Sequence, residues 1–497
     1  MRFTISAEPA TLDFLGASDV WSLTIGELIS DPLVVFDEDL SIRPAAAASW
    51  EWSADHRELR FHLTPGLSWH DGRPVTSADV VHTYQRLIDP LTGDATRAAS
   101  LSLVTDVIAI DPETVLVRYA QPFAPALSAW AVVPLVPAHT DPESFPPIGC
   151  GPWKLARWDR GERLILAAYR DHPRNPPLIE RLELEVLADY STRLAALDAG
   201  RVDISGLLPS QWRDRKKDAD FLGRFNITEF RMLYYWYIAW RMDGSNPFFA
   251  DARVRQAMTL AIDRQAYLDS LGADASAVAV SSFHPESWAF DRSVSPWPHD
   301  PARARALLDE AGWKLGEDSL VRERGGVPLR FTLTYAATSA ETEKIAAFVK
   351  ASLAEVGAET ELRPLEWAVC LDAIRRRDFQ ALMSGMHLDP DPDPYDLWHS
   401  SQTETGANYA GLADEQIDGW IEQARVSFER EERSRIYRLV QRRLHELQPN
   451  TFFFYPNSRS VVVRELAGVS AGPRGMLRVR PGPAAWHWQA PPPSAAR

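Results

Sequence analysis

The most regular hydrophobic pattern in the chain lies in residues 59–88. Apolar residues at every second position predict a strand with one buried face, at Leu59, Phe61 and Leu63. Pro65 follows in a turn, and Thr76 then occupies the N-cap of a predicted helix, with Asp79 at the acidic third position of a capping box. The buried face of this helix is predicted at Val80, Tyr84, Leu87 and Ile88.

Later segments carry the same local signals. Asp251 is the predicted N-cap of a helix whose buried face holds Val254, Met258, Ala261 and Ile262. The segment Asp300–Gly312 begins with Asp at the N-cap and Pro at the first helical position, and Gly ends the helix. Residues 433–447 predict an amphipathic helix that leads into a strand over 451–455. After Pro481 the Pro- and Ala-rich sequence predicts a frayed tail.

Residues 230–240 form the densest aromatic run of the chain. Read as a strand, the run places alternate side chains on opposite faces. One face would carry Met232, Tyr234, Trp236 and Ile238, and the other Leu233, Tyr235, Tyr237 and Ala239. Either both faces are buried, or one face packs and the other meets a ligand.

Length and charge narrow the class of protein. A chain of 497 residues is long enough for two or three lobes, because single cores stop growing at about 250 to 300 residues. The net charge of -15 argues against a nucleic-acid partner, since phosphate binding needs clustered cations. Proline breaks the longest apolar run, residues 124–138, so no membrane span is predicted. The spacing of Cys150 and Cys370 leaves open whether they form a disulfide.

A second candidate site is the acidic, proline-rich segment 386–399. Asp389, Asp391 and Asp393 alternate as at the start of a calcium loop, but Pro394 stands where such a loop needs Gly. We therefore predict no metal ligands and no cofactor. Alternating prolines instead fix an extended segment that holds its acids in place. The acids either shape a ligand pocket or cap neighbouring backbone N–H groups.

Familiar catalytic motifs are absent from the sequence, including the zinc-protease, serine-hydrolase and phosphate-loop patterns. The histidines occur as single residues. The sequence therefore predicts a binding protein and no enzyme.

The chain resembles the family 5 extracellular solute-binding proteins, the dipeptide, oligopeptide and nickel receptors of ABC importers. The block 59–88 is similar to the signature of this family, and further boxes follow in family order from residue 8 to about residue 469. These boxes are 148–164, 201–203, 246–264 and 300–312. The resemblance implies an α/β, type II periplasmic-binding-protein fold of the Venus-flytrap kind.

The implied architecture has two lobes and an inserted subdomain. Lobe one would take residues 1–30, 150–232 and 456–497, the inserted subdomain 31–149, and lobe two 233–455. The crossovers between lobes would be residues 230–242 and 451–459. Ligands of the family lie in the cleft beside these crossovers, which implies ligand-binding residues at Trp21, Tyr234, Tyr235, Trp236, Trp367, Asp389, Asp391 and Trp398.

The implied function is capture of a small solute, such as a peptide, opine, sugar or chelate, and its delivery to ABC permease subunits by a monomer. An oligopeptide-like solute is favoured. In peptide-binding relatives an aspartate of the acidic loop neutralises the ligand ammonium. Direct alignment places Pro390 there, and only a one-residue slip brings Asp389 to the position.

The expected location is the periplasm or the extracellular face of the membrane, with a secretory leader trimmed from this chain, which starts without one. The alternative is a cytoplasmic ligand-sensing protein that reuses the fold.

Overall fold

The computed structural model describes residues 1–141, 144–271, 276–404 and 406–489. The chain divides into two compact units. Unit 1 consists of residues 1–232 and 458–497, and unit 2 of residues 233–457. The chain therefore passes between the units twice, at Met232–Leu233 and at Asn457–Ser458. Further division of unit 1 into a lobe and an inserted subdomain stays a prediction.

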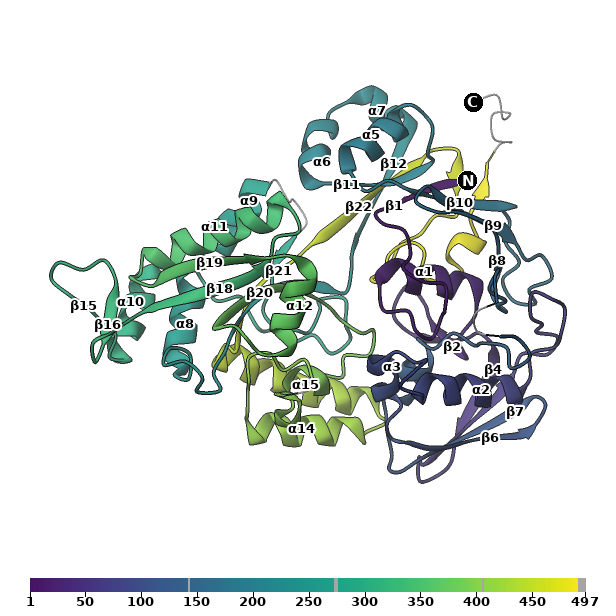
Figure 1. Cartoon of the computed structure of the whole chain (residues 1–497), viewed down its shortest axis with the longest axis horizontal. Helices are drawn as coiled ribbons and strands as arrows, with labels where there is room; N and C mark the ends of the chain where they lie inside the picture. The colour runs from purple at the N-terminus through teal and green to yellow at the C-terminus, as the bar shows by residue number, and fades with distance from the viewer. Residues whose placement is uncertain (142–143, 272–275, 405, 490–497) are drawn as a thin grey trace. The chain divides into compact units, whose positions relative to one another are not determined.

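Unit 1 contains a seven-stranded mixed sheet (Figure 1). Its strands, in spatial order, are β12 (Phe225–Arg231), β22 (Asn457–Val463), β11 (Ile204–Leu207), β1 (Arg2–Ile5), β10 (Arg181–Val186), β9 (Arg163–Ala168) and β8 (Trp153–Asp159). The strand β1 pairs in parallel with β10 and β11. The associated helices are α1 (Val20–Ile29), α5 (Tyr190–Asp198), α6 (Pro209–Arg215) and α7 (Ala219–Arg224).

The block 59–88 supplies one strand of a four-stranded antiparallel sheet in unit 1 and then continues into a helix. The strands of the sheet are β4 (Ala47–Trp52), β5 (Glu58–Leu63), β7 (Thr114–Tyr119) and β6 (Val104–Asp111). Nearby elements are α2 (Ser77–Ile88), α3 (Ala95–Ser100), α4 (Ala126–Trp130) and the pair β2 (Val34–Phe36) and β3 (Ile42–Pro44). The predicted strand and helix are confirmed, with Leu59, Phe61 and Val80 fully buried, but Ile88 is 44% exposed at the end of α2 and does not belong to the buried face.

The predicted cap of α2 is confirmed, and its acid does more than cap. A carboxylate oxygen of Asp79 accepts the backbone N–H of Thr76 at 2.8 Å. The other oxygen accepts the N–H of Ala138 at 2.9 Å. Asp79 therefore joins the start of α2 to a segment fifty-nine residues further along the chain.

Unit 2 is built on a six-stranded mixed sheet. Its spatial order is β14 (Ala277–Val278), β21 (Asn450–Tyr455), β13 (Tyr234–Trp240), β20 (Ala381–His387), β18 (Arg330–Ala336) and β19 (Glu359–Leu365). A small separate sheet holds β15 (Lys314–Leu315), β16 (Arg322–Arg324) and β17 (Val327–Pro328).

Two cores flank the larger sheet of unit 2. The first core packs α8 (Ala252–Ala261), α9 (Arg264–Leu271), α10 (Pro301–Glu310) and α11 (Ala340–Ala354). The second packs α12 (Trp367–Arg375), α13 (Tyr395–Trp398), α14 (Glu415–Arg425) and α15 (Arg430–Leu447), and a short 3-10 helix, η1 (Ser400–Gln402), follows α13. The predicted N-caps Asp251 and Asp300 and the left-handed stop at Gly312 are confirmed.

The predicted fraying after Pro481 is wrong for residues 482–489. These residues form η2 (Gly482–Ala484) and β24 (His487–Trp488), which pairs with β23 (Leu466–Ala467). Trp486 is fully buried, so an apolar anchor holds this segment despite its prolines. The rest of the predicted tail lies outside the described residues.

Cys150 and Cys370 are both buried free thiols, one in each unit.

Candidate ligand-binding site

The aromatic run enters unit 2 as β13, a central strand between β20 and β21. The strand begins at Tyr234, so Met232 and Leu233 are not part of it. From there the predicted alternation is confirmed: Tyr235 and Tyr237 belong to the second core, and Ile238 to the first. One face of β13 therefore packs in the second core and the opposite face packs in the first core.

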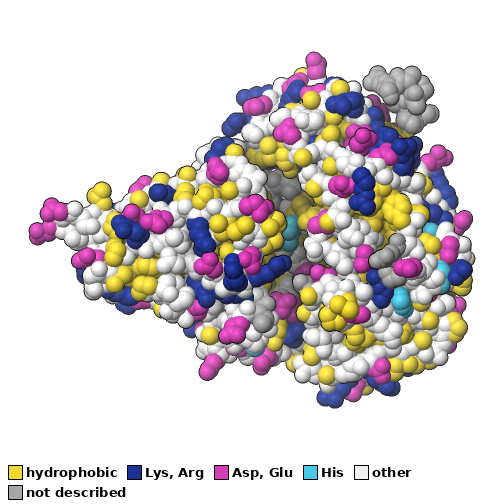
Figure 2. All heavy atoms as spheres, in the orientation of Figure 1, with side chains coloured by type: hydrophobic (Ala, Val, Ile, Leu, Met, Phe, Trp, Pro, Cys, Tyr) yellow, Lys and Arg dark blue, Asp and Glu magenta, His cyan; other side chains and the backbone are white. Residues whose placement is uncertain are grey.

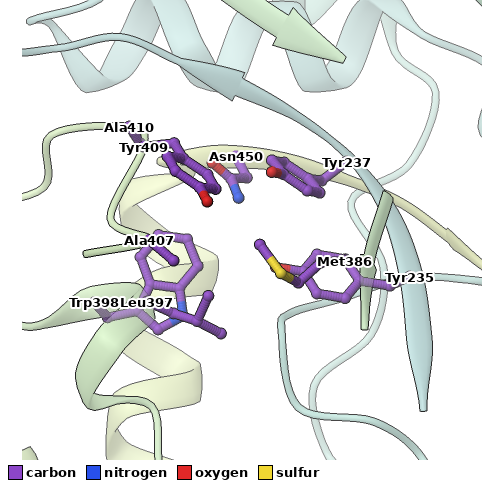
Figure 3. Close-up of a pocket in the computed structure, with 9 residues that line it drawn as sticks. All are labelled: Tyr235, Tyr237, Met386, Leu397, Trp398, Ala407, Tyr409, Ala410 and Asn450. Atoms are coloured by element: carbon purple, nitrogen blue, oxygen red, sulfur yellow. The ribbon is translucent and has the colours of Figure 1, made fainter. Parts of the chain in front are cut away.

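A pocket lies on the second-core face of β13, within unit 2 (Figure 3). The pocket has a cavity volume of about 10 Å³ and is partly open, so in this structure it has room for about one water-sized group. The lining residues are Tyr235, Tyr237, Met386, Leu397, Trp398, Ala407, Tyr409, Ala410 and Asn450. They come from β13, β20, β21, α13 and the loop after η1, so strands and a helix end hold most of the wall.

Hydrogen bonds fix the loop that carries Tyr409. The side-chain amide of Asn408 donates to the carbonyl of Leu412 at 2.8 Å and accepts the N–H of the same residue at 3.0 Å. The guanidinium of Arg377 lies over the Tyr409 ring, 4.8 Å from its centroid, and donates to the carbonyl of Thr403 at 3.0 Å. These contacts hold the loop around Tyr409 in place within the pocket wall.

The aromatic side chains of the pocket are neutral hydrogen-bonding groups. Trp398 is 2% exposed, and its indole N–H donates to the Ser282 hydroxyl at 2.7 Å. Burial raises the pKa of Tyr235 and of Tyr237 above the ordinary tyrosine value. Both phenols therefore stay protonated at neutral pH and present O–H groups and ring faces, without charge.

The acidic loop 389–393 is compensated by arginines from two helices. Arg433 in α15 donates both terminal nitrogens to the carboxylate of Asp391, at 2.6 and 2.9 Å. Burial opposes the charge of Arg433, but the Asp391 carboxylate outweighs it and raises the pKa of the guanidinium. Asp393 lies 3.0 Å from Arg425 in α14. Two of the three acids thus hold the loop against the helices.

The titration of Asp393 differs from that of an exposed aspartate. Burial is the main cause, and it raises the pKa of Asp393 to about 6, with the negative charge of Asp391 adding to the rise and Arg425 opposing it.

The remaining predicted site residues lie elsewhere. Tyr234 packs against His387, with ring centroids 4.7 Å apart, and Trp236 stacks on Phe454 at the first-core face. Asp389 is exposed, and Trp367 is 52% exposed at the start of α12. Trp21 belongs to α1 of unit 1, where its indole N–H donates to the Ser6 hydroxyl at 2.7 Å.

Of the eight predicted residues, the pocket therefore brings together Tyr235 and Trp398. Sequence reasoning missed Tyr409 and Asn450. Asn450 could have been found as a polar residue at the start of an otherwise apolar strand, but the predicted strand began one residue later, at Thr451.

Two features are absent from the described residues. Within them, no cluster of three or more His, Cys, Asp or Glu side chains is arranged to bind a metal ion. Over the same residues, no helix has the length and hydropathy of a membrane span. Acidic and basic side chains are interspersed over the visible face in Figure 2, in keeping with the net charge of -15.

Comparison with known proteins decides the family. Residues 41–408 match the family described as bacterial extracellular solute-binding proteins, family 5, middle region. The chain belongs to this family. The resemblance predicted from the sequence is therefore confirmed, and the protein is a solute-binding protein of the type that serves ABC importers.

Curated relatives of this family 5 protein cover most of its length. The oligopeptide-binding protein AppA of Bacillus subtilis is 27% identical over 486 residues, which are 94% of this chain and 88% of the relative. The dipeptide-binding protein of Escherichia coli is 25% identical over 87% of this chain and 84% of its own. The nickel-binding periplasmic protein of the same organism is 25% identical over 84% of this chain and 82% of its own.

Solved structures share the fold. AppA from Bacillus subtilis in complex with a nonapeptide has a TM-score of 0.83 at 25% identity, covering 98% of both chains. NikA from Brucella suis in complex with Fe(III)-EDTA has a TM-score of 0.86 at 22% identity, covering 98% of this chain and 99% of that one. The predicted α/β, type II periplasmic-binding-protein fold is thus confirmed.

Proposed function

We propose that this protein captures an oligopeptide-like solute and delivers it to the permease subunits of an ABC importer. The observation that carries the proposal is the family match over residues 41–408, with relatives whose names specify oligopeptide and dipeptide binding. The aromatic and amide lining of the pocket on β13 supports it, because such sites combine apolar contact with a few placed polar groups. No bond is made or broken.

Capture in this proposal works by closure of the two units about the strand connections at residues 232–233 and 457–458. A ligand that contacts both units only in the closed form stabilises that form by its differential affinity. Trp21 would supply a contact from unit 1. Unit 2 would supply the contacts Tyr234, Tyr235, Trp236, Trp367, Asp389 and Trp398, and the predicted Asp391 would shape the loop beside the ligand.

In this proposal the acidic loop 389–393 supplies the acid that binds the amino terminus of a peptide. Arg433 and Arg425 compensate Asp391 and Asp393, so we assign Asp391 the role of holding the loop in shape beside the ligand. We propose the exposed Asp389 as the acid that faces a ligand ammonium. Removing the ligand ammonium by acetylation then tests this residue directly.

We further propose that the protein acts as a monomer in the periplasm or at the extracellular face of the membrane. The relatives that support this location include the nickel-binding periplasmic protein of Escherichia coli. The permease subunits would dock on the ligand-loaded form, which links delivery to capture.

The test is calorimetry and thermal unfolding with defined di-, tri- and tetrapeptides, with free amino acids as controls. A peptide at a hundred times its Kd should stabilise the folded protein by about 2.7 kcal/mol and raise the Tm. Acetylating the amino terminus should weaken binding to the wild type, and this difference should vanish in Asp389→Asn. Stabilisation by an opine, sugar or chelate and by no peptide would overturn the peptide assignment.

A further inference from the structure

Asn450, the first residue of β21, is the one polar aliphatic side chain in the lining of the β13 pocket. The residue is 4% exposed, and among the described residues its amide oxygen has no hydrogen-bond partner. Figure 3 shows the amide between Tyr409 and Tyr237, directed into the space of the pocket. A buried amide oxygen without a partner costs about 1 to 3 kcal/mol, and the pocket beside Asn450 has room for the donor that would satisfy it.

The position of Asn450 contrasts with its neighbours in the same strand. The next residue, Thr451, has its hydroxyl within hydrogen-bond distance of the Thr259 hydroxyl, at 2.6 Å, and accepts the indole N–H of Trp240 at 3.0 Å. Phe452 packs in the second core. Tyr455, at the end of the strand, has its hydroxyl bonded to the carbonyls of Ser281 and Phe283 at 2.8 Å. The strand therefore satisfies its other buried polar side chains and leaves the one at the pocket open.

The rest of the lining selects against charge. The described lining residues include three tyrosines, one tryptophan, one methionine and small or aliphatic side chains, and none of them is charged. An ionised ligand group entering this space would lose its hydration without gaining a counter-ion, which is far more costly than burying a neutral group. A neutral group with an N–H or O–H donor instead meets the open amide acceptor, with ring faces around its carbon atoms.

We propose that this pocket is a specificity subsite for a neutral ligand group that carries an N–H or O–H donor, a carboxamide or hydroxyl, recognised by Asn450. The inference deepens the proposed function and rests on it, since it assigns the kind of solute side chain that unit 2 accepts. Rotation of the amide can present either its oxygen or its nitrogen, so a group that both donates and accepts is matched best.

The first experiment needs no peptide. Protein labelled with ¹⁵N at asparagine is titrated with acetamide as the neutral probe and with acetate as the charged probe of the same size. Acetamide should shift the side-chain signal of Asn450 in a saturable way, and acetate should not. The signal of Asn408 is the internal control, because its amide is already satisfied by Leu412. No shift with acetamide, or an equal shift with acetate, would overturn the subsite.

Variants separate recognition from stability. Asn450→Leu removes the amide, and Asn450→Asp keeps its shape and serves for signal assignment if the leucine variant fails to fold. Thr334→Val is the matched control, because Thr334 is also fully buried with an unpartnered side-chain oxygen, in β18 of the same sheet but outside the pocket lining. Acetamide binding should persist in Thr334→Val and be lost in Asn450→Leu.

The second experiment uses alanine tetrapeptides in which one residue at a time is Thr or its isostere Val. At one position the wild type should bind Thr about tenfold to a hundredfold more tightly than Val, and Asn450→Leu should abolish that preference. Equal preference in both proteins would overturn recognition by Asn450. Acetamide binding without any peptide binding would leave the subsite standing and remove the peptide assignment, so the two failures are distinguishable.

Discussion

Glu27 in unit 1 and Asn450 in unit 2 are both buried polar residues, but their surroundings differ. Glu27 accepts both a 2.8 Å and a 3.1 Å hydrogen bond from Arg474, and Arg478 donates to the same carboxylate. Arg480 donates to the backbone carbonyl of Glu27 at 2.7 Å. Asn450 has an open amide beside a pocket. Full compensation indicates a structural role for Glu27, whereas the open amide of Asn450 at the cavity is the observation on which the proposed recognition rests.

The arginines around Glu27 explain how residues 474–480 are held against α1. They belong to the segment that precedes η2, and they tie this segment to α1 more than four hundred residues earlier. Arg480 also donates to Asp31 at 2.7 Å, and His172 lies 3.1 Å from the other oxygen of that carboxylate. The carboxylates of Glu27 and Asp31 therefore already accept hydrogen bonds from arginine side chains of the described residues.

The largest expected effect comes from breaking that network. In Glu27→Ala the guanidinium of Arg474 stays buried without its counter-charge, and we expect the free energy of unfolding to fall by about 3 to 5 kcal/mol. Urea denaturation measures it. The control is Glu51→Ala, whose ion pair with Arg60 is exposed and should contribute about 0 to 1 kcal/mol. Similar small losses in both variants would contradict the structural role of Glu27.

Glu27 in unit 1 and Asp393 in unit 2 should change the free energy of unfolding in opposite directions as the pH rises. Burial alone would raise the pKa of Glu27, but Arg474 and Arg478 lower it to about 2, below the ordinary 4.5. Its stabilisation is therefore complete above about pH 4.5 and is lost as the pH falls toward 2. Asp393 has its pKa raised to about 6, so its ionisation destabilises unit 2 as the pH rises from 3.8 to 6.

The measurement is unfolding free energy against pH for the wild type, Glu27→Gln and Asp393→Asn. Glu27→Gln should flatten the acid limb, and Asp393→Asn should remove a decrease between pH 3.8 and 6. If Asp393→Asn instead reduced stability most at neutral pH, its pairing with Arg425 would outweigh burial, and the assigned direction would be wrong.

A smaller effect is expected on peptide affinity, with little change in the free energy of unfolding. Tyr235→Phe removes one hydroxyl from the pocket and keeps the ring, so we expect peptide affinity to fall about two- to tenfold with stability changed by no more than about 1 kcal/mol. Calorimetry with a peptide that binds the wild type checks it. Tyr335→Phe is the control, since that buried tyrosine lies in β18 and in the first core. An equal loss of affinity in both variants would argue against the pocket as the contact.

The sequence predicted elements whose signals are local. The alternation at Leu59–Leu63, the capping box at Thr76 and the stop at Gly312 each depend on a few neighbouring residues, so the fold around them follows from the chain alone. The two faces of β13 were likewise predicted from alternation. The break at Met232 was missed, because the aromatic run gives no turn signal there.

The site was less predictable because its chemistry depends on distant partners. Asp391 resembled a free ligand acid, but Arg433, forty-two residues later, pairs with it. Asn450 was missed because the predicted strand began at Thr451, and its lack of a hydrogen-bond partner is a property of the folded unit. The prolines after Pro481 suggested fraying, and the anchoring by Trp486 and the arginines near the chain end could not be inferred from composition.

Small-angle scattering tests the central claim, capture of a solute by closure of the two units, most directly. The radius of gyration is measured for the ligand-free protein and for the protein saturated with a peptide shown to bind by calorimetry. The account predicts a smaller radius on saturation, because the ligand favours the closed form. An unchanged radius at full saturation would contradict capture by closure.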